Sequence, residues 1–130
     1  MLGIDTNVLV RFLVRDDERQ FAKAHSQIQR EVRDGGVVVS LLVQLEAEWV
    51  LRSRYGLKKS EIAAVLSGLL EASNIRIEDE SSVEEALDVW SSSAADFTDC
   101  LIGSHNRRLG CRATTTFDIT ASKLPGFVLL

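Results

Sequence analysis

Two patterns of apolar and polar positions alternate along the chain. Short apolar or β-branched runs are typical of buried strands, and longer stretches with helical spacing separate them. The runs that predict strands are 2–4, 37–39, 75–77, 113–117 and 127–130. The stretches that predict helices are 8–14, 17–34, 41–55, 60–73, 82–92 and 97–109, with Ser40 and Ser60 as expected N-caps.

This order of elements predicts an α/β fold. Strands that alternate with helices form parallel sheets, because each helix carries the chain back to the starting edge. We therefore expect a three-layer α/β/α sandwich with a central, mainly parallel sheet of four or five strands. The length of 130 residues suits one domain, and we expect it to span residues 1–130.

Composition narrows the class of protein. Hydrophobic residues make up 45% of the chain and charged residues 26%, as in globular rather than disordered proteins. No apolar run reaches the roughly 18–20 residues of a membrane span, and the start lacks the features of a signal peptide. Cys100 and Cys111 form no disulfide framework. We therefore expect a cytoplasmic protein with reduced thiols and no membrane association.

Net charge and basic composition do not by themselves identify the binding partners of the protein. The net charge of −4 argues against a general cationic binder of nucleic acids. However, only four of the 15 basic residues are lysines, and arginine suits bidentate contacts with phosphate. A GC-rich genome would produce the same excess of arginine.

Polar residues follow several of the predicted strands. Asp5 comes directly after the first strand, Ser40 after the second, and Asp118 after the strand at 113–117. Ligands of open α/β sheets bind at the carboxyl ends of the strands. Capping of the next helix is an alternative role for Asp5, and for Ser40 it is the favoured one.

The predicted helix at 41–55 carries an acid within an apolar arc. At 100° per residue Glu46 falls inside this arc, whereas Glu48 falls on the opposite side. A glutamate that faces a core needs an arginine or a cation beside it, and we favour a cation. The apolar arc consists of Leu42, Leu45, Trp49 and Val50, with Val43 at its edge.

Two further acids begin the predicted helix at 97–109. Asp96 could cap this helix and Asp99 could act as the acid of the first turn, so both have a structural alternative. Asp99 shares a narrow face with Gly103 and Asn106. Small and polar residues on that face predict room for a bound group.

Together, Asp5, Glu46, Asp99 and Asp118 indicate a metal site. Clustered carboxylates repel one another unless a cation holds them. Oxygen ligands without paired Cys or His favour Mg²⁺ or Mn²⁺ over zinc. Such an ion activates water and stabilises the charge that develops on a phosphodiester, so the pattern predicts hydrolysis without a covalent intermediate.

The chain resembles the PIN-domain ribonucleases, and among them the VapC-type toxins of bacterial toxin–antitoxin pairs. Four motifs carry the resemblance, each with one of the four acids, and they span nearly the whole chain. They are IDTNVL at 4–9, SLLVQLEAEWVLRSRY at 40–55, ADFTDCLIGSHNRRLGC at 95–111 and TTFD at 115–118, followed by LPGF at 124–127.

The resemblance implies a Mg²⁺-dependent endoribonuclease that also accepts Mn²⁺, with RNA as its substrate and a cognate antitoxin as its inhibitor. It further implies a homodimer and the strand order 3-2-1-4-5. Asp5 and Asp99 would be the principal metal ligands, Asp118 a ligand through water or for a second ion, and Glu46 the residue that positions or deprotonates water. Supporting roles would fall to Thr6, Ser40, Asp96 and Thr116, and candidate phosphate contacts are Arg11, Arg15, Arg107 and Arg112.

Two alternatives belong to other classes. A PIN-like domain could bind RNA or a protein without cleavage, although all four acids are present. A phosphoacceptor receiver domain has a similar length and a parallel sheet. It expects an acidic pair after the first strand, where this chain offers only Asp5.

Overall fold

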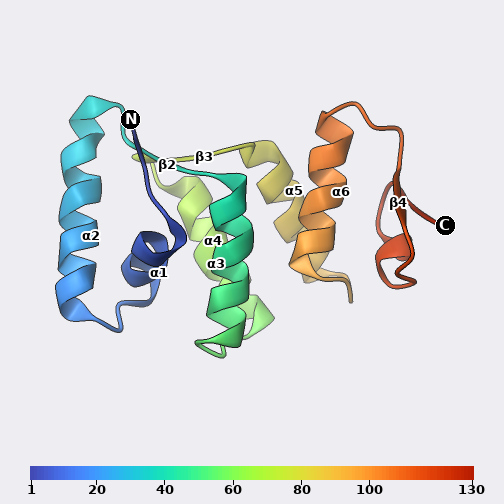
Figure 1. The fold of residues 1–130 in the computed structure, drawn as a ribbon, viewed down its shortest axis with the longest axis horizontal. Coiled ribbons are helices and arrows are strands. Elements are labelled where there is room, and N and C mark those ends of the chain that lie inside the picture. The colour runs from blue at the N-terminus through green and yellow to red at the C-terminus, as the bar shows by residue number, and fades with distance from the viewer. The chain divides into compact units, whose positions relative to one another are not determined.

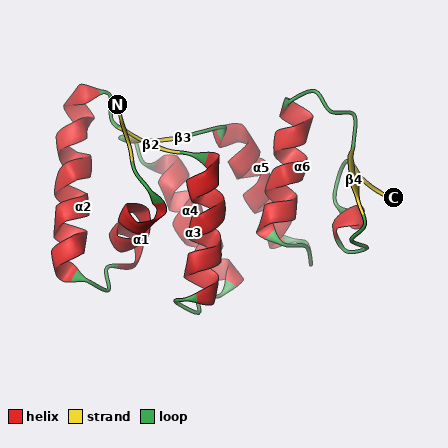
Figure 2. Cartoon of the chain, in the orientation of Figure 1, coloured by secondary structure: helices red, strands yellow, loops and turns green.

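The computed structural model describes residues 1–130 (Figure 1). The chain divides into two compact units, Met1–Glu78 and Asp79–Leu130. Along the chain a pair of α-helices separates each strand from the next as far as the fourth strand, and only a 3₁₀ turn separates the fourth strand from the fifth (Figure 2). None of the helices combines the length and the apolar character that crossing a membrane requires.

The first unit is a three-stranded parallel sheet with four helices. Its strands are β1 (Leu2–Gly3), β2 (Val37–Val39) and β3 (Ile75–Ile77), in the order β1-β2-β3. Its helices are α1 (Thr6–Val14), α2 (Glu18–Glu31), α3 (Leu41–Ser53) and α4 (Lys59–Glu71), with a 3₁₀ turn at Val32–Asp34. The core includes Leu9, Val37, Val39, Leu51 and Ile62, none of which is exposed.

Helix starts follow directly on strand ends in this unit. Asp5 Oδ1 accepts a hydrogen bond from Val8 N–H at 3.0 Å, which caps α1. Ser40 Oγ accepts one from Val43 N–H at 3.3 Å, which caps α3. Because Gly3 pairs with Val38 in the parallel register, Asp5 and Ser40 lie at the same edge of the sheet.

The second unit packs two helices and a two-stranded parallel sheet. Helices α5 (Glu80–Ser91) and α6 (Phe97–Arg108) lie side by side. The edge of the Trp90 ring meets the Phe97 ring at a centroid distance of 5.2 Å. Strand β4 (Thr114–Thr116) pairs with β5 (Phe127–Leu129), and a 3₁₀ turn at Ala121–Lys123 connects them.

The structure confirms the alternation of elements and their parallel pairing. Strands β2 and β3 have the predicted bounds, and the order of the first three strands is as expected. The neighbourhood of β4 and β5 is also as expected, whereas the step from β1 to β4 stays a prediction.

The predicted cap at Ser60 is wrong. Helix α4 begins at Lys59 with Lys58 as its N-cap residue, and Glu61 Oε1 accepts a hydrogen bond from Lys58 N–H at 2.9 Å. This reverse contact from the third helical residue satisfies the start of the helix, so it begins earlier than Ser60.

Candidate active site

Asp5 lies at the carboxyl end of β1 and is exposed. One of its carboxylate oxygens caps α1, and the side chain forms no ion pair. Ser40 occupies the matching position after β2 and caps α3, as the sequence favoured. The two strand ends thus hold one carboxylate and one hydroxyl at one sheet edge.

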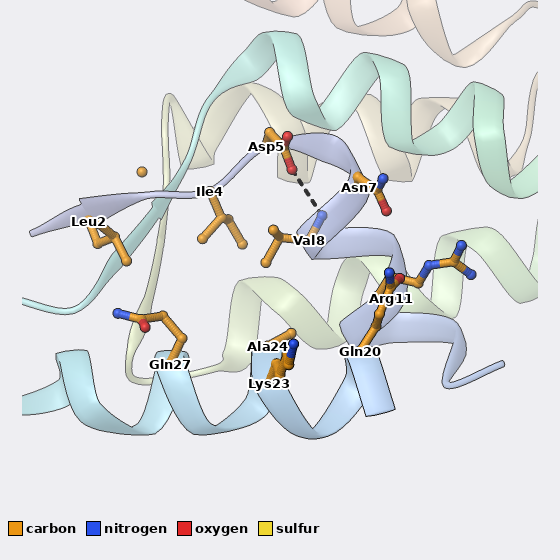
Figure 3. A pocket seen from close by; sticks show the side chains of 11 residues that line it. Leu2, Ile4, Asp5, Asn7, Val8, Arg11, Gln20, Lys23, Ala24 and Gln27 are labelled. Atoms are coloured by element: carbon orange, nitrogen blue, oxygen red, sulfur yellow. Dashed lines mark hydrogen bonds between the residues drawn. The ribbon is translucent and has the colours of Figure 1, made fainter. Parts of the chain in front are cut away.

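The hollow between β1, α1 and α2 has a volume of about 620 Å³ (Figure 3). Leu2 and Gln27 lie at the opposite end from Asn7 and Arg11, and the dashed line marks the hydrogen bond from Val8 to Asp5. Four of the eleven lining residues are aliphatic and six are polar or charged. Asp5 is the only acid that lines it, so this hollow by itself offers no cluster of metal ligands.

The predicted core-facing position of Glu46 is wrong. Helix α3 buries Gln44, Ala47, Glu48 and Leu51, whereas Glu46 is exposed. Glu48 is the acid in the interior, with 3% of its surface exposed. Its Oε1 accepts a hydrogen bond from Arg52 Nε at 3.0 Å.

Glu46 nevertheless lies beside the start of α1. Together with Thr6, Asn7 and Arg11 it lines a second hollow, of about 230 Å³, between α1 and α3. Glu46 forms no ion pair. Glu46 and Thr6, the residue that follows Asp5, thus line the same hollow, although the predicted helix face of Glu46 was wrong.

Asp99 is electrostatically coupled to two other acids of the second unit. Asp99 lies in the first turn of α6 and is partly buried. Burial raises the pKa of Asp99 above its ordinary value, and the charges of Asp96 and Asp118 raise it further. The carboxylates of α6 and of the turn after β4 are therefore close enough to repel one another.

Asp96 and Asp118 take different local roles. Asp96 occupies the N-cap position of α6, but its side chain makes no capping hydrogen bond, so the capping alternative for Asp96 is wrong. Asp118 Oδ1 accepts a hydrogen bond from Ala121 N–H at 2.8 Å. Thr116 Oγ1 accepts one from Asp118 N–H at 3.0 Å, so Thr116 helps to order the turn that carries Asp118.

The predicted space along the Asp99 face of α6 is filled. A Cβ atom at Gly103 would collide with the ring of Phe127, so the absence of a side chain at this position lets β5 pack against α6. Asn106 Nδ2 donates a hydrogen bond to Thr114 Oγ1 at 3.0 Å. The small and polar residues of this face thus serve packing within the second unit, and the interpretation as ligand space is wrong.

Most of the candidate phosphate contacts are already paired. Arg11 donates to both oxygens of Asp16 at 2.9 Å, Arg15 pairs with Glu18, and Arg107 pairs with Glu85. Arg112 is exposed and forms no ion pair. Arg112 is therefore the one candidate among the four whose charge is not already matched by a carboxylate.

The sequence assigned no part in the active site to three residues of the hollow between α1 and α3. Asn7, Trp49 and Arg54 all line it. Asn7 stands within the first motif, and Trp49 was expected in the core-facing apolar arc of its helix, which is wrong because 49% of its surface is exposed. Their only signal was position, because Asn7 follows the first strand and Trp49 lies one helical turn after Glu46.

The donor chemistry of the acids fits a divalent cation. In neither unit do three His, Cys, Asp or Glu side chains already gather into a metal site. The charges of Asp96 and Asp118 disfavour the ionised form of Asp99, a repulsion that a cation would relieve, and carboxylate oxygens are the ligands that Mg²⁺ and Mn²⁺ prefer.

Comparison with known proteins agrees with the geometry. A search of curated proteins found no match. The family model described as PIN domain matches residues 3–126. The PIN domain is generally a metal-dependent nuclease fold, and an α/β structure of helices around parallel strands is consistent with it. The chain therefore belongs to the PIN domain family.

Proposed function

We propose that this protein is a Mg²⁺-dependent endoribonuclease and the toxin of a toxin–antitoxin pair. Membership of the PIN domain family supports the nuclease part. The structural observation that carries the proposal is the position of Asp99, partly buried in the first turn of α6 with the acids Asp96 and Asp118 near it. The resemblance to VapC-type toxins supports the toxin role, a cytoplasmic homodimer and an antitoxin partner.

The role proposed for each acid is the one that the resemblance to PIN-domain ribonucleases implies. Asp5 and Asp99 are the principal metal ligands, and Asp118 binds through water or holds a second ion. When bound, a divalent ion supplies a water of lowered pKa and stabilises charge on the phosphate. Asp118 and Asp5 each use one oxygen to cap a turn or helix, so their carboxylates are held in place before any ligand arrives.

Glu46 is the proposed acceptor of the proton from the attacking water. Its carboxylate is exposed and forms no ion pair, so a water molecule can reach it. Thr6 lines the same hollow as Glu46 and is a neighbour for a phosphate oxygen. Ser40 and Thr116 hold the backbone of the turns beside the acids.

Cleavage of RNA with and without the metal tests the nuclease. The wild type should cut RNA in Mg²⁺ or Mn²⁺ and stop in EDTA, and Asp99→Asn should cut at least 100-fold more slowly because a metal-binding charge is lost. Asp88→Asn is the matched control, since Asp88 is an exposed acid of the same unit. RNA binding without cleavage in either metal would identify the non-catalytic alternative instead.

Growth of a bacterial host tests the toxin role separately. Induced expression of the wild type should arrest growth, Asp99→Asn should not, and co-expression of the protein encoded beside the gene should restore growth. The purified protein could cleave RNA while its expression does not arrest growth and it does not bind the protein encoded beside its gene. In that case the toxin role is wrong and the nuclease function remains. Sedimentation of the purified protein as 14.4 kDa monomers alone would contradict the homodimer.

A further inference from the structure

Groups without a partner gather in the hollow between α1 and α3. Trp49 keeps 49% of its surface exposed. Arg54 is exposed and forms no ion pair, and no hydrogen bond engages the side-chain amide of Asn7. All three line a hollow of about 230 Å³ that also holds Glu46. The proposed hydrolysis uses none of the first three.

The walls of this hollow are ordered. Arg11 Nη1 donates to Asp16 at 2.9 Å and to Tyr55 Oη at 3.2 Å, which ties α1 to the end of α3. Tyr55 Oη also donates to Asp16 Oδ2 at 3.0 Å. The Nε atom of Arg11 is buried without an acceptor. The hollow therefore has a fixed polar end beside the half-exposed ring of Trp49.

These groups match the parts of a nucleotide. A half-exposed indole offers a flat face on which any base can stack, an amide can hydrogen-bond to a base edge, and an unpaired guanidinium suits a phosphate. The volume lies below the roughly 300–1,000 Å³ of pockets that enclose a whole small ligand. It therefore suits one planar group of an extended chain.

We propose that this hollow is a subsite for one unpaired base of the RNA substrate. The base stacks on Trp49, its edge contacts Asn7, and Arg54 contacts a phosphate beside it. This inference rests on the proposed ribonuclease function and deepens it, because it assigns a binding site for one nucleotide beside the proposed catalytic Glu46. Bases of an A-form duplex are stacked on one another and are not free to enter.

The separation of Glu46 and Arg54 along α3 indicates the path of the RNA strand. Arg54 follows Glu46 by eight residues, which is roughly 12 Å along a helix. The phosphate at Arg54 is therefore not the one beside Glu46, and Trp49 lies between the two. The subsite thus holds a nucleotide that flanks the scissile bond.

Binding in EDTA tests the stacking on Trp49 independently of cleavage. A fluorescein-labelled single-stranded oligoribonucleotide reports affinity by anisotropy, and an unlabelled one reports stacking by quenching tryptophan fluorescence. Trp90, the other tryptophan, is only 4% exposed, so the quench should come from Trp49. A duplex of the same sequence should bind more weakly and cause no quench.

Substitutions at Trp49 separate stacking from general apolar contact. Trp49→Ala and Trp49→Leu should each weaken binding by roughly 10-fold or more, because neither offers a π-face. Trp49→Phe should keep most of the affinity and abolish the quench. Leu42→Ala is the matched control, since Leu42 is 77% exposed on the same helix and does not line the hollow. It should bind as the wild type does.

Salt dependence tests Arg54. Arg54→Gln should reduce the slope of log affinity against log salt by about 0.7, the value for one phosphate contact on a single strand. Arg33→Gln, an exposed arginine outside the hollow, should leave the slope unchanged. Circular dichroism melts confirm that each variant is folded.

Three results would overturn the subsite. The first is wild-type affinity in Trp49→Ala or Trp49→Leu, and the second is equal affinity for the duplex. The third is a wild type that binds no RNA in EDTA. If Trp49→Ala instead turns a dimer into a monomer at unchanged RNA affinity, the face of α3 is an interface between chains. Cleavage that depends on Asp99 would still establish the nuclease in each of these cases.

Discussion

Two glutamates on α3 provide a sharp test of which acid is catalytic and which is structural. Glu46 is exposed and lines the hollow beside α1. Glu48, two positions later, is 3% exposed and accepts a hydrogen bond from Arg52 Nε at 3.0 Å. We expect Glu46→Ala to remove activity without loss of stability, and Glu48→Ala to do the reverse.

The expected change in stability follows from burial. Truncation of Glu48 removes a hydrogen bond to a charged group, which contributes about 1.5–3 kcal/mol, and leaves unfilled space around the former stem. The variant no longer buries a charged carboxylate, and the desolvation cost that this saves offsets part of the loss. The net loss is about 2 kcal/mol. With an unfolding entropy of about 0.27 kcal/mol/K for a chain of this length, Tm falls by about 7 °C.

Glu46→Ala should change the free energy of unfolding by less than about 0.5 kcal/mol, because it replaces an exposed, unpaired side chain. Its cleavage of RNA should fall roughly 100-fold or more, as for the loss of a general base. Thermal melts by circular dichroism and cleavage assays about 20 °C below the lower Tm measure both effects. Equal Tm values for the two variants, or full activity in Glu46→Ala, would refute the assignment.

Three further predictions concern the second unit. Asp99→Asn should raise Tm in EDTA, because a carboxyl whose pKa is raised by burial and by neighbouring acids destabilises the folded state when ionised. Mg²⁺ at about 100 times its Kd should stabilise the wild type by about 2.7 kcal/mol and leave this variant's melt unchanged. Hydrogen bonds from Arg108 and Arg107 outweigh burial and hold the pKa of Glu85 below its ordinary value. The stability that ionised Glu85 contributes to the folded state is therefore present above about pH 4.3 and lost as pH falls further. In urea unfolding, Glu85→Gln should be less stable than the wild type by about 0.5–1 kcal/mol at pH 7, and this difference should shrink at pH 3. Gly103→Ala should lower the free energy of unfolding in urea by about 1 kcal/mol, because the added Cβ meets Phe127. The control Gly68→Ala, in α4 of the first unit with open space around it, should raise this free energy by about as much. A Gly103→Ala variant more stable than the wild type would contradict the packing of Phe127 against α6.

Local chemistry made most elements of the fold predictable. The β-branched run at 37–39 has few alternatives to a buried strand, and β2 has those bounds. Ser40 and Asp5 stand directly after strands, where an oxygen can accept a hydrogen bond from a backbone N–H of the next helix, and both do so. These features depend on a few neighbouring residues, so the sequence carries them.

The buried face of α3 was not predictable from apolar positions alone. Leu42 and Trp49 lie outward, with 77% and 49% exposed, while Gln44 and Glu48 lie inward. The rule that apolar residues face the interior fails where an apolar face remains open and an inward acid has an arginine beside it. Arg52 supplies that partner from one helical turn away. Only tertiary packing decides between the two faces.

In the candidate site too, features set by neighbouring residues were predictable and features set by tertiary packing were not. Strand ends predicted the edge at which Asp5 and Ser40 lie, because parallel strands end together. The sequence also predicted that Asp99 and Asp118 lie near each other, and the charge of Asp118 contributes to the raised pKa of Asp99. The hollow between α1 and α3 was not expected, because it depends on how two helices pack. The filling of the Gly103 face by Phe127 was missed for the same reason.

The capping roles of the acids decide which substitution separates charge from structure. Asp5 caps α1, and Asp118 accepts the hydrogen bond from Ala121 N–H, so alanine at either position would remove a structural contact together with a charge. An N-cap replaced by alanine costs about 1 kcal/mol, whereas asparagine caps about as well as aspartate. Asp5→Asn and Asp118→Asn therefore keep the turn and remove only the anion. A loss of cleavage in these variants at unchanged Tm locates the effect in metal binding, because the remaining amide oxygen still holds the turn in place.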